Sequence, residues 1–173
     1  MERIYTKICF AGEGGVGKTT IARKLSAVST GQEGMTIGID FHVVRIPMDD
    51  MVLDILVFDL GGQQQFRDIL WDFFAGAECI VLTYDISRPS TATALEKWLE
   101  VLYPFKDMII IVGNKIDLPR RVNGTTIKAL IRKYGIKRHI ETSALTGEGL
   151  DELLRNILEV LIEQKKAQLT VTT

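Results

Sequence analysis

The stretch Gly12-Glu13-Gly14-Gly15-Val16-Gly17-Lys18-Thr19 decides how this sequence folds. Directly before it, Ile8-Cys9-Phe10-Ala11 is a short apolar run of the kind that forms a buried strand. Directly after it, Ile21, Leu25 and Val28 lie at helical spacing. We therefore expect a glycine-rich turn between a strand and a helix, which is the beginning of an α/β unit.

The rest of the chain continues this alternation of strands and helices. The turn Pro47-Met48-Asp49-Asp50 separates two apolar runs, which predicts an antiparallel hairpin. We expect strands at 8–11, 41–46, 52–58, 79–84, 108–112 and 139–142. Helical periodicity recurs around 95–102, 127–134 and 150–161. The predicted fold class is α/β, a mostly parallel six-stranded sheet with one antiparallel strand, flanked by about five helices.

Composition and charge limit the class of protein. At ~150 residues per domain, the 173 residues predict a single domain over 1–173, with a core at about 6–165 and a tail at 166–173. The balance of 21 Lys+Arg against 22 Asp+Glu argues against a nucleic-acid partner. Cys9 and Cys79 lie in apolar runs, so we expect buried, reduced thiols in a cytoplasmic protein. We find no signal peptide, no run of the ~20 apolar residues that a membrane span needs, and no lipid-anchor signal.

The glycine-rich loop, residues 12–19, matches the pattern G-x-x-x-x-G-K-[ST]. Glycines let the chain curl so that several backbone N–H groups point at one phosphate, and the following helix adds positive charge. Lys18 is expected to reach the β- and γ-phosphates, and the Thr19 hydroxyl to bind Mg²⁺. The alternative is a turn with an incidental lysine. The residues expected to hold the phosphates of a nucleoside triphosphate are Gly14, Gly15, Val16, Gly17, Lys18, Thr19 and Thr20.

Asn114-Lys115-Ile116-Asp117 follows a predicted strand and indicates which base is bound. The Asp117 carboxylate can accept hydrogen bonds from the N1–H and the 2-amino group of guanine, a donor pair that adenine lacks. Ser143 and Ala144 follow the last short strand, where their backbone N–H groups can meet the guanine oxygen. Alone, the first four residues also fit a polar turn.

Together these motifs resemble those of the Ras-like small GTPases, over about residues 6–165. Thr36, within Met35-Thr36-Ile37-Gly38-Ile39-Asp40-Phe41, resembles the first switch and is similar to Rab proteins. The stretch Asp59-Leu60-Gly61-Gly62-Gln63 resembles the second switch, and its Gly-Gly-Gln is similar to Arf proteins. The resemblance implies the P-loop NTPase fold and a GTP/GDP molecular switch that slowly hydrolyses GTP.

The resemblance also implies roles for single residues. Thr19 and Thr36 would bind Mg²⁺, and Asp59 would act on the metal mainly through water. The Gly62 backbone N–H would meet the γ-phosphate. Gln63 would orient the attacking water, and with Lys18 it forms the catalytic pair. The implied partners are an activating protein that supplies an arginine, an exchange factor and effectors.

Three departures from the family pattern concern the switch segments. No aromatic residue stands between Thr20 and Thr36, where the family has one against the guanine. We treat Ser26–Met35 as a glycine-containing loop there and expect faster GDP release. Glu33 stands where an internal catalytic arginine would be, and Gln64 replaces an acidic residue that exchange factors often contact.

Other features leave alternatives open. Residues 118–140 contain seven basic residues and no acid, either a solvated face or a patch for weak electrostatic contact with a membrane or an acidic partner. Trp71, Phe73 and Phe74 are core residues or, where exposed, an effector contact. A scaffold that binds GTP without hydrolysing it and a P-loop kinase of small substrates are the competing functions.

Overall fold

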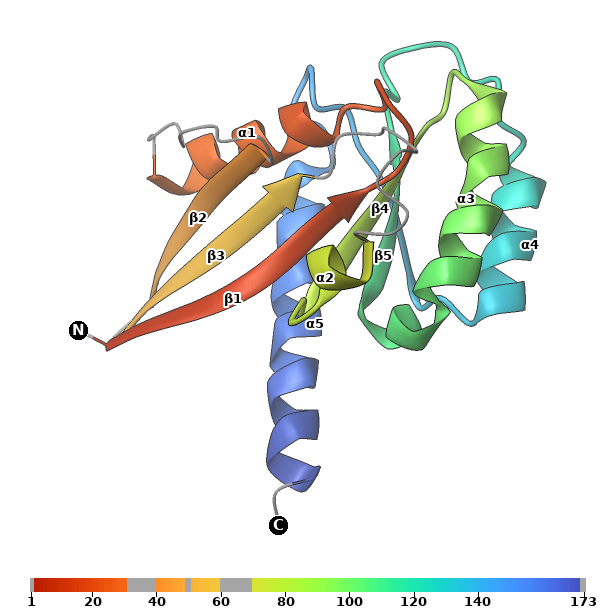
Figure 1. The fold of residues 1–173 in the computed structure, drawn as a ribbon. Helices are drawn as coiled ribbons and strands as arrows, with labels where there is room; N and C mark the ends of the chain where they lie inside the picture. Colours follow the sequence, from red (N-terminus) through yellow and green to blue (C-terminus); the bar gives the residue numbers. More distant parts are fainter. Residues whose placement is uncertain (1, 31–39, 49–50, 60–69, 172–173) are drawn as a thin grey trace.

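The computed structural model of the chain describes residues 2–30, 40–48, 51–59 and 70–171. It contains one six-stranded sheet in the order β2-β3-β1-β4-β5-β6 (Figure 1). Only β2 runs antiparallel to its neighbour β3, and every other pair is parallel. The predicted fold class and the predicted hairpin are therefore confirmed.

The elements alternate along the chain as the sequence pattern predicts. The strands are β1 (Glu2–Ala11), β2 (Asp40–Met48), β3 (Met51–Asp59), β4 (Cys79–Asp85), β5 (Ile109–Asn114) and β6 (Arg138–Glu141). The helices are α1 (Lys18–Thr30), α2 (Leu70–Phe74), α3 (Pro89–Leu102), the 3-10 helix η2 (Tyr103–Met108), α4 (Gly124–Tyr134) and α5 (Leu150–Val171).

Helices cover both faces of the sheet, so the core has two layers. One layer packs α2, α3 and α4 against the sheet, and the other packs α1 and α5. Every residue of β4 and β5 is buried, which explains why both strands are apolar up to the polar residues near their carboxyl ends. Cys9 and Cys79 are buried free thiols, as predicted, and burial raises the pKa of Cys9 to about 12.

Four boundaries differ from the sequence prediction. β1 begins at Glu2, because its polar first half pairs in parallel with β3. Pro47 lies inside β2 and not in a turn, which an edge strand tolerates because its outer N–H groups need no partner. α1 continues to Thr30, so the stretch from Ser26 to Thr30 is helical and the predicted loop is wrong there. α5 continues to Val171, beyond the predicted core.

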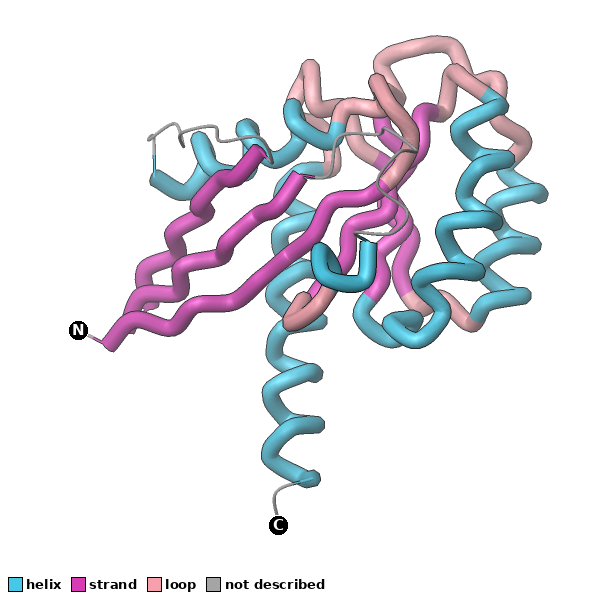
Figure 2. Tube along the Cα trace, viewed as in Figure 1, coloured by secondary structure: helices cyan, strands magenta, loops and turns pink. Residues whose placement is uncertain are grey.

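The arrangement of the strands gathers the functional loops at one end of the sheet. The loops that follow β1, β4, β5 and β6 meet there, at the carboxyl ends of the parallel strands (Figure 2). Ligands of open α/β sheets bind at this edge. The predicted phosphate and base residues lie in three of these four loops, after β1, β5 and β6.

Candidate functional site

The glycine-rich loop is pressed against the loops that follow β4 and β5. Gly12 and Gly17 have φ angles of 135° and 101°, which L side chains rarely adopt. A Cβ on Gly12 would lie 2.2 Å from the backbone oxygen of Thr83, and a Cβ on Gly17 would lie 2.2 Å from Asn114 Nδ2. Only glycine fits at either position, so the loop keeps its curled shape.

Lys18 begins α1 and turns its side chain back over the loop. The residue is buried, and its Nζ donates to the carbonyls of Gly12 at 2.9 Å and Glu13 at 2.8 Å. The ammonium group is therefore held inside the curl of the loop. Val16 is buried, whereas Gly14 and Gly15 are exposed. The first turn of α1 places Thr19 half-buried and Thr20 exposed.

Asn114, the last residue of β5, joins the glycine-rich loop to the loop after β6. Its Nδ2 donates to the Val16 carbonyl at 2.9 Å. Its Oδ1 accepts from Thr142 Oγ1 at 3.0 Å and from the Ala144 backbone N–H at 3.1 Å. Three hydrogen bonds to one buried amide fix the relative positions of the two loops.

Lys115 reaches the glycine-rich loop from the next position. It has a φ of 68°, and its Nζ donates to the Gly15 carbonyl at 2.7 Å. The same Nζ lies 3.0 Å from a carboxylate oxygen of Asp85, the buried last residue of β4. Burial raises the pKa of Asp85, but hydrogen bonds from Ser87 and the contact with Lys115 outweigh it and hold the pKa below its ordinary value.

Sequence reasoning missed Asp85, although an acidic residue directly after a buried strand, at the ligand edge of the sheet, was a usable signal.

The predicted base-binding residues lie together at this edge. Ser143 Oγ donates to Asp117 Oδ1 at 2.7 Å, which orients the exposed carboxylate of Asp117. The backbone N–H of Ser143 donates to Glu148, and that of Ala144 donates to Asn114. A guanine oxygen would have to share or replace the hydrogen bond of the Ala144 N–H.

The donor set near Thr19 fits Mg²⁺, which takes oxygen ligands, keeps several waters and binds few protein groups beside the phosphates. Thr19 lies in the first turn of α1. β3 ends at Asp59, which pairs in register with Phe10, two residues before the glycine-rich loop. No group of three or more His, Cys, Asp or Glu gathers among the described residues. The side chain of Asp59, and Thr36, Gly62 and Gln63 entirely, lie outside the described residues.

Ion pairs occupy most of the basic stretch at 118–140. The pairs are Arg120 with Glu141, Lys133 with Glu96, Lys137 with Asp107, and Arg138 with Glu159 and Glu163. Within the described residues, Arg121, Lys128 and Arg132 have no ion pair. Of the three aromatic residues of α2, Phe73 and Phe74 are buried, and Trp71 is 54% exposed.

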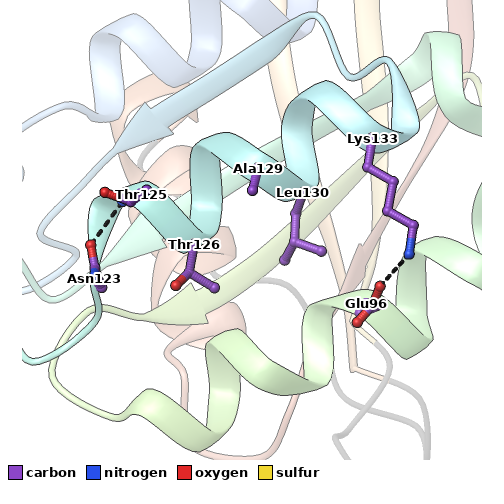
Figure 3. A pocket seen from close by; sticks show the side chains of 7 residues that line it. All are labelled: Glu96, Asn123, Thr125, Thr126, Ala129, Leu130 and Lys133. Atoms are coloured by element: carbon purple, nitrogen blue, oxygen red, sulfur yellow. Dashed lines mark hydrogen bonds and ion pairs between the residues drawn. The ribbon is translucent and has the colours of Figure 1, made fainter.

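A hollow of about 430 Å³ lies between α3 and α4, away from the glycine-rich loop (Figure 3). Its lining residues are Glu96, Asn123, Thr125, Thr126, Ala129, Leu130 and Lys133. Lys133 Nζ donates to Glu96 at 2.6 Å, and Asn123 caps the first turn of α4 at Thr125. None of the predicted site residues lines this hollow.

The sequence model of the Ras family matches residues 7–163. The chain is similar to a putative Ras-related protein Rab-5B of Dictyostelium discoideum, with 31% identity over 92% of this chain and 77% of the relative. It is similar to Ras-related protein Rab-18 of Caenorhabditis elegans, with 32% identity over 91% of this chain and 80% of the relative. It is also similar to Ras-related protein Rab-19 of Homo sapiens, with 30% identity over 94% of this chain and 78% of the relative.

The family match covers nearly the whole chain and contradicts the non-hydrolysing scaffold and the small-substrate kinase. Proteins of this family act with activating proteins, exchange factors and effectors. No helix in the described ranges has the length and apolar character of a membrane span. The chain belongs to the Ras family: it is a small GTPase that binds GTP or GDP with Mg²⁺, hydrolyses GTP and acts as a molecular switch.

Proposed function

We propose that Asn114, Lys115 and Asp117, with Ser143 and Ala144, bind and select the guanine base. The observation that carries this assignment is the set of hydrogen bonds around Asn114. One buried side chain connects the Val16 carbonyl of the glycine-rich loop with the Ala144 N–H of the base loop. A base between these loops therefore lies at a fixed distance from the phosphates, which binding of one whole nucleotide requires.

The phosphates and the metal occupy the loop after β1. Backbone N–H groups from Gly14 to Thr20 bind the phosphates, and Lys18 neutralises the β- and γ-phosphates. Mg²⁺ is bound by Thr19 and Thr36, with Asp59 acting through water. The Gly62 N–H binds the γ-phosphate. Gln63 orients the attacking water, since phosphoryl transfer asks the protein for positioning and charge stabilisation.

The partners follow from the charge of the site and from one exposed side chain. Glu33 stands where an internal arginine would be, so we propose that an activating protein supplies the arginine. Trp71, which follows the second switch in the sequence, is 54% exposed, and we assign it to the effector contact.

Among the residues that the structure describes, we assign no second binding role to the rest of the surface. Four of the seven basic residues at 118–140 are ion-paired, which favours a solvated face there over a patch for a membrane or an acidic partner, and we assign no nucleic-acid partner. We also propose that residues 1–173 form a single domain and that the protein acts in the cytoplasm.

The substitution Asp117→Asn tests the base assignment. An amide nitrogen at this position would face the N1–H and 2-amino donors of the bound guanine and leave one of these donors, covered by the bound base, without an acceptor. That costs ~1–3 kcal/mol, which corresponds to roughly a 5- to 150-fold loss of GTP affinity. Xanthosine triphosphate carries an oxygen in place of the 2-amino group, so its affinity should rise.

The measurement is titration of both nucleotides with the unchanged chain and the variant. Asp107→Asn is the matched control, because Asp107 is an exposed carboxylate paired with Lys137 away from the site. Equal preference for GTP and xanthosine triphosphate in the unchanged protein would contradict the role of Asp117. Loss of GTP affinity in both variants would show a general charge effect and contradict it as well.

A further inference from the structure

Three successive carbonyls of the glycine-rich loop each accept one side-chain hydrogen bond from a neighbouring loop. The pairs are Val16 with Asn114 at 2.9 Å, Gly15 with Lys115 at 2.7 Å and Gly14 with Arg88 at 2.7 Å. The first two donors belong to the predicted base motif. Arg88 belongs to no predicted motif, and it extends the same row by one peptide.

The geometry of the peptide bond links each of these three carbonyls to the direction of the next backbone N–H. In a trans peptide the carbonyl of one residue and the N–H of the next point in opposite directions, and the structure contains no cis peptide among its described residues. A donor that holds the Gly14 carbonyl outward therefore turns the Gly15 N–H inward, to the side where the phosphates lie. Lys115 and Asn114 do the same for the N–H groups of Val16 and Gly17.

Arg88 is itself held firmly. Its Nε lies 3.3 Å from the carboxylate of Asp85, the same group that pairs with Lys115. Its backbone N–H donates to the Asp85 carbonyl at 3.0 Å. Thr91 Oγ1 accepts from the Asp85 N–H and donates to the Arg88 carbonyl at 2.8 Å. One buried carboxylate thus directs two cations at two adjacent carbonyls of the loop.

We propose that Arg88 is a positioning residue of the phosphate site, which holds the Gly14–Gly15 peptide with its N–H toward the β- and γ-phosphates and strengthens that donor. A cation that hydrogen-bonds a carbonyl polarises the whole peptide, so the N–H at its other end becomes more positive. Arginine suits this task because its planar fork binds Asp85 with one nitrogen and Gly14 with another. The inference depends on the proposed phosphate role of residues 14–20.

The position of Arg88 in the row predicts which phosphates are affected. Asn114 and Lys115 come from the loop that carries Asp117, so their peptides lie nearest the base. Of the three carbonyls at Gly14, Gly15 and Val16, that of Gly14 is farthest along the loop from that end and from the α1 N-terminus. Arg88 should therefore affect the outer phosphates and leave the contacts of the α-phosphate and the base unchanged.

The substitution Arg88→Gln, compared with Arg88→Lys, tests this. We expect Arg88→Gln to weaken GDP binding roughly 3- to 10-fold, the range of one typical hydrogen bond, and to leave GMP binding unchanged. Arg88→Lys keeps the charge and loses the planar fork, so its GDP affinity should lie between that of the unchanged protein and that of Arg88→Gln. Arg120→Gln is the matched control: Arg120 has a similar exposed fraction, 43% against 45%, and its substitution changes the net charge equally. Thermal melting of each variant checks the fold.

Each outcome decides the matter. Equal weakening of GDP and GMP would overturn the proposal, because it would mean general support of the loop. Unchanged GDP affinity would also overturn it. A fall of about 10³-fold or more in the single-turnover rate of GTP hydrolysis, at unchanged GDP affinity, would show that Arg88 contacts the transferring phosphoryl group directly. That result would overturn the positioning role. Failure of the unchanged protein to bind any guanine nucleotide would instead contradict the proposed phosphate site.

Discussion

Replacing Gly17 by alanine should damage the site and the fold together. The φ of Gly17 is 101°, and an added Cβ would lie 2.2 Å from Asn114 Nδ2. Such a contact costs little free energy when the neighbour is the free end of a flexible side chain that can move away. Asn114 is not free, since it is buried and makes three hydrogen bonds at 2.9–3.1 Å. The substitution therefore has to displace the group that joins the two loops.

Two contributions set the loss of unfolding free energy in Gly17→Ala. A non-glycine residue held at a positive φ costs ~1–3 kcal/mol. Displacing Asn114 leaves a buried donor or acceptor without its partner, which costs another ~1–3 kcal/mol. The sum is about 2–6 kcal/mol, and a change near the middle lowers the melting temperature of a domain this size by roughly 8–16 °C. GDP should bind more weakly, because the Val16 carbonyl loses its donor.

Chemical denaturation and GDP titration of Gly17→Ala and Gly14→Ala measure the effect. Gly14 lies in the same loop, and a Cβ built on it meets nothing within 4 Å. The free energy of unfolding of Gly14→Ala should therefore lie within ~0.5 kcal/mol of that of the unchanged protein, as is usual for surface substitutions. If Gly17→Ala were as stable as Gly14→Ala, the close contact of Gly17 with Asn114 would not exist in solution, and the argument for the joined loops would fail.

Three further predictions concern catalysis, acid stability and the thiols. Gln63→Leu should slow single-turnover hydrolysis and leave GTP affinity unchanged, and equal hydrolysis rates would refute the role of Gln63. The pKa of Asp85 is lowered in the fold, so the stability that its ionised carboxylate contributes is complete above its ordinary pKa of about 4 and is lost as the pH falls through the folded pKa. The unfolding free energy of Asp85→Asn should accordingly be lower at pH 7 and depend less on pH below 4, and parallel curves for the two proteins would contradict this. Burial raises the pKa of Cys9 to about 12 and that of Cys79 further, so a thiol reagent at pH 8 should label neither until unfolding exposes both.

The sequence by itself determined the fold class and most of the candidate site. Strands buried on both faces, such as β4, show as unbroken apolar runs, because water contacts neither side. The glycine-rich loop could be found because a short segment supplies its own donors. Asn114 to Asp117 could be found because residues at a strand end lie at the ligand edge whatever the rest of the chain does.

Tertiary structure decided the contacts between segments far apart in the chain. The polar half of β1 is a strand because β3 offers it a partner. α1 extends through Ser26–Thr30, where the glycine-containing segment without an aromatic residue had suggested a loop. Asp85 has only a weak local signal, an acid directly after a buried strand, and Arg88 has none, since an exposed arginine three residues later looks like part of an ordinary turn. They gain a role only where the sheet order sets β4 between β1 and β5, which brings Arg88 to a carbonyl 74 residues away in sequence.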